Sequence, residues 1–156
     1  MSTHDLATLE LLLERASAER DRCIGDVRRA EEVQRHHQAQ GDQLSAYREE
    51  YVQRWSRQFG RGGAIEIVQC YQNFMQRLDE AMQQQKAQVE RASAARAAAH
   101  DALRQAEMRM ASVRKLIERR LQERQRAEQR SEQKQSDEAA QQLVMRRSPQ
   151  GLAFNH

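Results

Sequence analysis

The chain has 156 residues, which is room for one ordinary domain. Charged residues make up 31% of it and aromatic residues only 4%, which excludes a globular core of usual proportions. The formal net charge is +3, and the two signs alternate along the chain, which excludes the long single-sign block typical of a nucleic-acid-binding tail.

Residues 5–58 form the first predicted helix, which carries two apolar seams. Its positions are spaced alternately by three and four residues, the pattern of a coiled coil. The first seam is Leu6, Leu9, Leu13, Ala16, Arg20, Cys23, Val27 and Ala30. The second seam is Val33, His37, Gln40, Leu44, Tyr47 and Tyr51. The step of three from Ala30 to Val33, where four is due, predicts a stammer in the coil.

Three of the six glycines, Gly60, Gly62 and Gly63, lie within four positions of a chain otherwise rich in helix formers. Glycine ends helices because it adopts the left-handed backbone that other residues resist. The cluster therefore predicts a bend over residues 59–64. With its centre near residue 61, residue i faces about residue 122 − i on the returning helix.

The second predicted helix spans residues 65–147 and has the cleaner period. Thirteen of its fifteen seam residues are apolar. They are Val68, Tyr71, Met75, Leu78, Met82, Gln85, Val89, Ala92, Arg96, Ala99, Leu103, Ala106, Met110, Val113 and Ile117. A strict 3.5-residue period implies a left-handed supercoil and a partner helix. Because the first seam begins at Leu6 and the second ends at Ile117, the chain supplies that partner to itself.

The predicted fold is therefore all-α, a long antiparallel two-helix coiled coil (an αα-hairpin) with an overhanging C-terminal helix. Residues 1–150 form this single hairpin. The overhang from Glu118 to Gln150 has no residues of the first helix left to face, so it either frays or docks on a partner. Pro149 is expected to end the helix, and residues 148–156 to form a flexible tail.

The facing rule gives further expectations. Arg96 should lie near Asp26, and Arg20 near Asp101, unless both arginines extend to water. Cys23 and Cys70 would lie far apart, which excludes a disulfide between them. Two buried thiols in a reducing cytoplasm are expected instead.

The sequence predicts no catalytic, metal or cofactor site. None of the five histidines has a ligand-like spacing to another histidine, a cysteine or a carboxylate. The FGRGG stretch lacks the lysine and the hydroxyl residue of a phosphate loop. No secretory signal and no membrane-spanning run is expected. The densest basic stretch, residues 104–126, has eight basic and three acidic residues but no interleaved aromatics, so nucleic-acid binding is disfavoured.

Four segments of the chain form a recognisable set. They are LATLELLLERA (6–16), LSAYREEY (44–51), VQCYQNFMQRLDEAM (68–82) and EQKQSDEAAQQLVMRR (132–147). In this order and spacing they resemble the FliJ family of the flagellar type III export apparatus. The resemblance covers essentially the whole chain. Its most specific features are the YxxxY pair, the YQxF block after a glycine-containing bend, and the acidic-to-MRR tail.

The resemblance implies a non-enzymatic cytoplasmic stalk, similar to the γ subunit of rotary ATP synthases. Its implied partners are the hexameric ring of the export ATPase FliI, whose assembly it promotes, and the export gate protein FlhA. Substrate-specific export chaperones are a further implied partner. The chain would reach the inner membrane only through these partners and bind no nucleic acid.

The resemblance also implies binding residues. Those for the export gate are Gln40, Leu44, Tyr47, Tyr51, Phe74, Leu78 and Ala81. Gln85 stands where the family pattern has histidine, which puts its part in doubt. Those for the ATPase, at the other end, are Arg119, Arg120, Arg124 and Arg126. Leu44, Tyr47, Tyr51 and Leu78 are seam positions and have the alternative role of holding the hairpin shut, whereas Phe74 lies off the seam.

Three alternatives remain at this point. The first is the equivalent stalk protein of a virulence injectisome. The second is a generic coiled-coil scaffold that dimerises, and the third is a nucleic-acid-binding rod.

Overall fold

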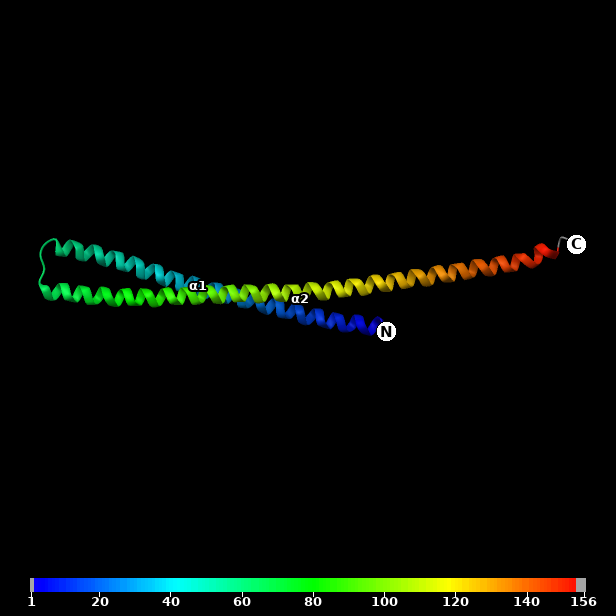
Figure 1. Cartoon of the computed structure of the whole chain (residues 1–156), viewed down its shortest axis with the longest axis horizontal. Coiled ribbons are helices and arrows are strands. Elements are labelled where there is room, and N and C mark those ends of the chain that lie inside the picture. Colours follow the sequence, from blue (N-terminus) through cyan, green and yellow to red (C-terminus); the bar gives the residue numbers. More distant parts are fainter. Residues whose placement is uncertain (1, 154–156) are drawn as a thin grey trace. The chain divides into compact units, whose positions relative to one another are not determined.

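The computed structural model describes the secondary structure of residues 2–153 and the side chains of residues 5–147. It has two helices, α1 (Ser2–Phe59) and α2 (Ile65–Ala153), and the described residues include no strand. Figure 1 shows that the end of α1 and the start of α2 are joined by a short bend. The predicted all-α helical hairpin is confirmed.

The chain divides into two compact units, each built from part of α1 and part of α2. The bend unit comprises residues 17–108, and the terminal unit comprises residues 1–16 and 109–156. Each is described separately below. The assignment of residues 1–150 to a single domain stays a prediction.

The bend forms as the glycine cluster predicted, but only one glycine needs its special backbone. Gly62 has a φ of +83°, the one positive φ among the described residues. The turn before it tightens, since Arg61 N donates to Gln58 O at 3.2 Å and Gly62 N donates to Phe59 O at 3.1 Å. Gly62 thus ends α1 in the left-handed conformation that an L side chain resists.

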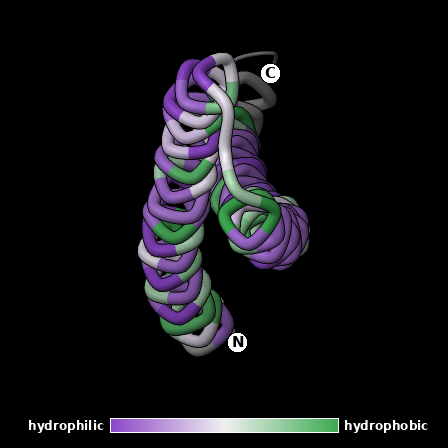
Figure 2. Tube along the Cα trace, turned by 90° about the vertical axis from the view of Figure 1, so that its left-hand side faces the viewer, coloured by the Kyte–Doolittle hydropathy of each residue, from purple (hydrophilic) through white to green (hydrophobic). Residues whose placement is uncertain are grey.

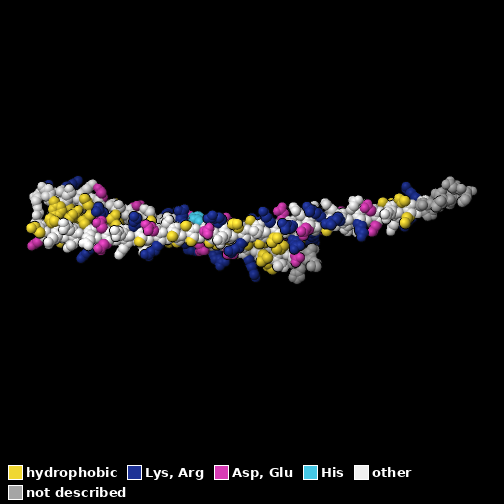
Figure 3. All heavy atoms as spheres, in the orientation of Figure 1, with side chains coloured by type: hydrophobic (Ala, Val, Ile, Leu, Met, Phe, Trp, Pro, Cys, Tyr) yellow, Lys and Arg dark blue, Asp and Glu magenta, His cyan; other side chains and the backbone are white. Residues whose placement is uncertain are grey.

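The seam of α2 follows its predicted period. Fourteen of the fifteen predicted positions are buried or half-buried, and the exception is Arg96. In the bend unit Leu78, Ala92 and Ala106 are between 2% and 7% exposed. Figure 2 shows hydrophobic segments recurring between hydrophilic ones along the helices, and in Figure 3 hydrophobic side chains gather beside the bend. The 3.5-residue period therefore identified the contact face of α2.

The predicted stammer in α1 is wrong. After Ala30 one row of half-buried positions keeps the alternation of four and three without a break: Gln34, His37, Gly41, Leu44, Arg48, Tyr51 and Trp55. Glu31, Val52 and Phe59 are half-buried outside this row. Val33 and Tyr47 are each 49% exposed, and Gln40 is exposed too. The apolar pattern misled because polar side chains and a glycine take inward positions in the middle of this helix.

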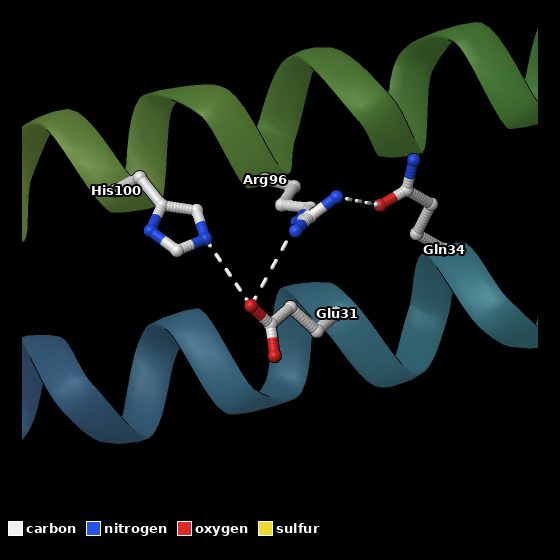
Figure 4. Close-up of polar contacts among 4 residues, drawn as sticks. All are labelled: Glu31, Gln34, Arg96 and His100. Atoms are coloured by element: carbon white, nitrogen blue, oxygen red, sulfur yellow. Dashed lines mark hydrogen bonds and ion pairs between the residues drawn. The ribbon is translucent and has the colours of Figure 1, made fainter.

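These inward polar groups find partners across the hairpin of the bend unit. Gln85 Nε2 donates to the His37 carbonyl oxygen at 2.6 Å. Glu31 Oε1 lies 3.2 Å from His100 Nε2 and 3.7 Å from Arg96 Nε, as Figure 4 shows. Arg96 Nη1 also donates to Gln34 Oε1 at 3.3 Å. These pairs make a polar middle tolerable, and the His37 side chain is the exception, since its Nδ1 is buried without a hydrogen-bond partner among the described residues.

The expected neighbour of Arg96 is therefore corrected from Asp26 to Glu31. Helical side chains lean toward the N-terminus of their own helix. On α2 that direction points toward the bend, so Arg96 reaches residues of α1 with higher numbers than the facing rule gives. Asp26 pairs with Arg29 on its own helix instead.

The expected pair of Arg20 and Asp101 is also wrong. Arg20 Nη2 lies 3.0 Å from Asp21 Oδ1, and Arg104 Nη2 lies 3.3 Å from Asp101 Oδ1. Both acids are thus paired with a neighbour on the same helix.

In the terminal unit the same seam ends where expected, but α2 continues. Leu6, Leu9 and Leu13 of α1 are half-buried. On α2, Met110 is 5% exposed, and Val113 and Ile117 are half-buried. Every side chain from 118 to 147 is exposed. These residues are the predicted overhang.

The predicted end of the second helix at Pro149 is wrong, because α2 extends to Ala153. Residues 154–156 of the predicted tail lie outside the described residues, and its flexibility stays a prediction. Within the described part of the chain, neither helix carries an apolar stretch sufficient to cross a membrane.

Candidate partner-binding site

Six of the seven aromatic residues lie together beside the bend, from both helices. They are Tyr47, Tyr51, Trp55 and Phe59 of α1 and Tyr71 and Phe74 of α2. The Tyr51 and Phe74 ring centroids are 4.2 Å apart, and those of Trp55 and Tyr71 are 5.2 Å apart. Ring pairs at these separations add to the stability that burial alone gives.

The seven residues expected to bind the gate all lie on one side of this hairpin, here called the aromatic flank. On α1 they follow the spacing 40, 44, 47, 51, and on α2 the spacing 74, 78, 81, so each set shares one helix face. The two faces meet, since the Tyr47 and Phe74 rings are 6.3 Å apart. The structure therefore brings the set together as one surface.

Burial separates the members of the aromatic flank. Leu78 is 7% exposed and packs in the seam, whereas Tyr47 is 49% exposed. Gln40 is exposed, and the remaining members, Leu44, Tyr51, Phe74 and Ala81, are half-buried. Leu78 thus supports the hairpin, and Tyr47 presents most of its ring edge to an incoming partner. Phe74 combines the two roles, because it is half-buried and its ring also packs on Tyr51.

Gln85 has a structural role at the position where the family pattern has histidine. Its Nε2 donates to the His37 carbonyl oxygen at 2.6 Å and lies 3.4 Å from Gln40 Oε1. The facing seam residue is Gly41, where an added Cβ would meet Gln85 Cγ at 3.6 Å. The amide therefore ties the two helices together next to the aromatic flank.

The other side of the bend unit, here called the polar flank, is charged. Arg48 Nε donates to Asp79 Oδ1 at 2.8 Å, and this hydrogen bond, followed by the charge of Asp79, raises the pKa of Arg48. A groove of about 580 Å³ runs beside this pair and includes Asp42, Asp79 and Lys86. Arg48 and Asp79 satisfy one another, so this pair offers no unpaired charge to a partner.

A groove of about 650 Å³ lies beside the aromatic flank and was not predicted from the sequence. Trp55, Ile67, Cys70 and Arg77 line it together with Tyr51 and Phe74. The spacing of Ile67, Cys70 and Phe74, at i, i+3 and i+7, is a second apolar stripe next to the seam and was visible in the sequence. Cys70 is exposed and Cys23 half-buried, both as free thiols, so the expected burial of Cys70 is wrong because it lies off the seam.

The four arginines expected to meet the ATPase lie on α2 in the terminal unit, where all are exposed. Arg120 Nη1 is 3.5 Å from Glu123 Oε2, and Arg124 Nε is 3.8 Å from Glu128 Oε1. No such pair holds Arg119 or Arg126 among the described residues. Their role in ATPase binding stays a prediction. No group of side chains suited to hold a metal ion occurs in the part of the chain that the structure describes.

Two long helices joined by a short bend, with aromatic rings packed between them beside it, define the class of the chain as a helical hairpin. The sequence model of the FliJ family, described as the flagellar FliJ protein, matches residues 5–149. This chain therefore belongs to the FliJ family of the flagellar type III export apparatus. Searches among curated proteins and among solved structures found no match.

Proposed function

We propose that this chain is a cytoplasmic stalk that promotes assembly of the FliI export ATPase ring and links that ring to the export gate protein FlhA. Export chaperones are further partners, and the inner membrane is reached only through the gate. The observation that carries the proposal is the convergence of the seven expected gate-binding residues on one flank. The match to the flagellar family favours this machine over the injectisome.

The aromatic flank has the composition of a protein-binding surface. Aromatic side chains are enriched at the centres of interfaces, where they bury a large area with few rotatable bonds. Tyr47 is 49% exposed, but its ring packs between two others. The ring centroid of Tyr47 lies 6.1 Å from that of Tyr51 and 6.3 Å from that of Phe74. A side chain that is already ordered loses less conformational entropy on binding.

The extension of α2 supports the contact with the ATPase. Side chains 118–147 are all exposed, so no helix face there is used for packing within the described structure. Arg119 and Arg126 present unpaired positive charge that would attract acidic loops at the centre of a ring. Such attraction mainly raises the rate of association and weakens with salt.

ATP turnover by FliI of the same organism tests this contact. The full chain is added at a substoichiometric ratio, and turnover and ring formation are recorded. We expect stimulation by the full chain and little by a variant with Arg119, Arg120, Arg124 and Arg126 replaced by Ala. A chain carrying Arg28→Ala and Arg35→Ala, both exposed in the bend unit, is the matched control.

Loss of stimulation in the four-arginine variant but not in the control supports an ATPase contact on the extension of α2. A well-folded full chain that leaves both turnover and ring formation unchanged contradicts the role in ring assembly.

A further inference from the structure

The groove beside the aromatic flank has an apolar lining that α1 leaves uncovered. Ile67 is 40% exposed and Cys70 is exposed, and both lie on the stripe of α2 that continues to Phe74. Trp55 of α1 lies opposite as a half-buried ring. An apolar surface of this kind on a chain that is 31% charged marks an interaction site.

The same groove carries one charge of each sign at separate positions. Glu66 lies in the first turn of α2, and Arg77 lies eleven residues further along the helix, about 16 Å away at 1.5 Å per residue. Neither side chain has an ion pair or a hydrogen bond among the described residues. The paired Arg48 and Asp79 of the polar flank contrast with them.

The groove is also continuous with the expected gate-binding set. Tyr51 and Phe74 belong to both, and their centroids are 4.2 Å apart. A partner seated on Tyr47 and Phe74 would reach Ile67 and Cys70 by following α2 toward the bend. A length of about 16 Å corresponds to about three turns of a helix laid along the groove.

We propose that this groove is the anchor of the gate contact and accepts an amphipathic helix of the gate protein. The apolar face of that helix packs on Trp55, Ile67 and Cys70. It carries a carboxylate opposite Arg77 and a basic side chain opposite Glu66. This inference rests on the proposed gate contact. It adds a helical segment of the partner, the direction of its charges, and five residues that the expected set does not include, namely Trp55, Glu66, Ile67, Cys70 and Arg77.

Protection of the Cys70 thiol tests the groove directly. Cys23→Ser leaves Cys70 as the one cysteine, and its maleimide labelling rate is measured with and without the soluble domain of the gate protein. At about ten times the Kd, labelling should slow about tenfold, because only the free fraction reacts. The matched control carries Cys23→Ser, Cys70→Ser and Gln72→Cys, which puts the thiol on the polar flank; its rate should not change.

A charge variant tests the polarity of the site. Arg77→Glu should weaken binding of the gate domain about tenfold, the effect of placing like charges at an interface. Gln83→Glu, a new carboxylate on the polar flank, should leave the Kd unchanged. Circular dichroism confirms that both variants keep the helical hairpin.

The outcomes separate the groove from the gate contact itself. One outcome overturns the groove proposal and leaves the gate contact standing. In it, Tyr47→Ala abolishes binding of the gate domain, but the gate domain does not slow the labelling of Cys70 in the Cys23→Ser chain. Equal protection of the Gln72→Cys thiol, or no effect of Arg77→Glu, also overturns it. A wild-type chain that does not bind the gate domain contradicts the proposed gate contact, and the groove proposal with it.

Discussion

At the scale of single residues, the backbone of Gly62 decides the bend. Its φ of +83° is unfavourable for an L residue, and an added Cβ would meet no atom within 4 Å. We expect Gly62→Ala to reduce the free energy of unfolding by about 1 kcal/mol for backbone reasons alone. Urea unfolding followed by circular dichroism measures this change.

Gly60→Ala is the control for that variant. Gly60 has no positive φ, and its added Cβ would lie 3.6 Å from the carbonyl oxygens of Ser56 and Arg57, an ordinary contact. Its stability should stay the same or rise, since alanine restricts the unfolded chain. Equal losses in the two variants would show that the bend does not depend on the left-handed backbone of Gly62.

Two valines of α1 test the corrected seam. Val27 is 8% exposed and Val33 is 49% exposed. We expect Val27→Ala to cost about 1–2 kcal/mol through lost apolar burial, and Val33→Ala to change stability by less than about 0.5 kcal/mol. Equal costs in thermal or urea unfolding would support the stammer that places Val33 in the seam.

At the scale of the elements, the two helices differ in how much the sequence revealed. The seam of α2 was predictable because thirteen of its fifteen positions are apolar. The seam in the middle of α1 was not predictable. Gln34, His37 and Gly41 take inward positions there, whereas the apolar pattern placed Val33, Gln40 and Tyr47 in the seam. The Gln34 side chain and the His37 carbonyl oxygen have partners on α2, which are Arg96 and Gln85. Such partners are visible only once the helices are paired.

The corrected partner of Arg96 gives a prediction at this scale. A double-mutant cycle of Glu31→Ala with Arg96→Ala should give a coupling of about 0.2–1 kcal/mol, the range for pairs that remain partly exposed. A cycle of Asp26→Ala with Arg96→Ala should give none. The opposite result would show that the facing rule holds without the lean of helical side chains.

At the scale of the whole molecule, the sequence indicated which residues share a surface better than it indicated the shape of that surface. The resemblance supplied seven positions, and the hairpin places all of them on the aromatic flank. The groove of Trp55, Ile67, Cys70 and Arg77 was missed because it depends on which side of each helix the seam leaves open. The stripe of Ile67, Cys70 and Phe74 can be read from the sequence of α2, but the sequence does not show that Trp55 of α1 lies opposite it.

The central claim is that the aromatic flank binds the export gate, and one titration tests it most directly. The soluble domain of the gate protein is titrated by calorimetry into the wild-type chain, Tyr47→Ala and the polar-flank control Gln72→Ala. Tyr47 is 49% exposed, so its truncation should leave the hairpin folded. We expect Tyr47→Ala to bind about 30-fold more weakly, the loss typical of an aromatic hot spot, and the control to bind like the wild type. Unchanged affinity in Tyr47→Ala, or an equal loss in both variants, would contradict the claim.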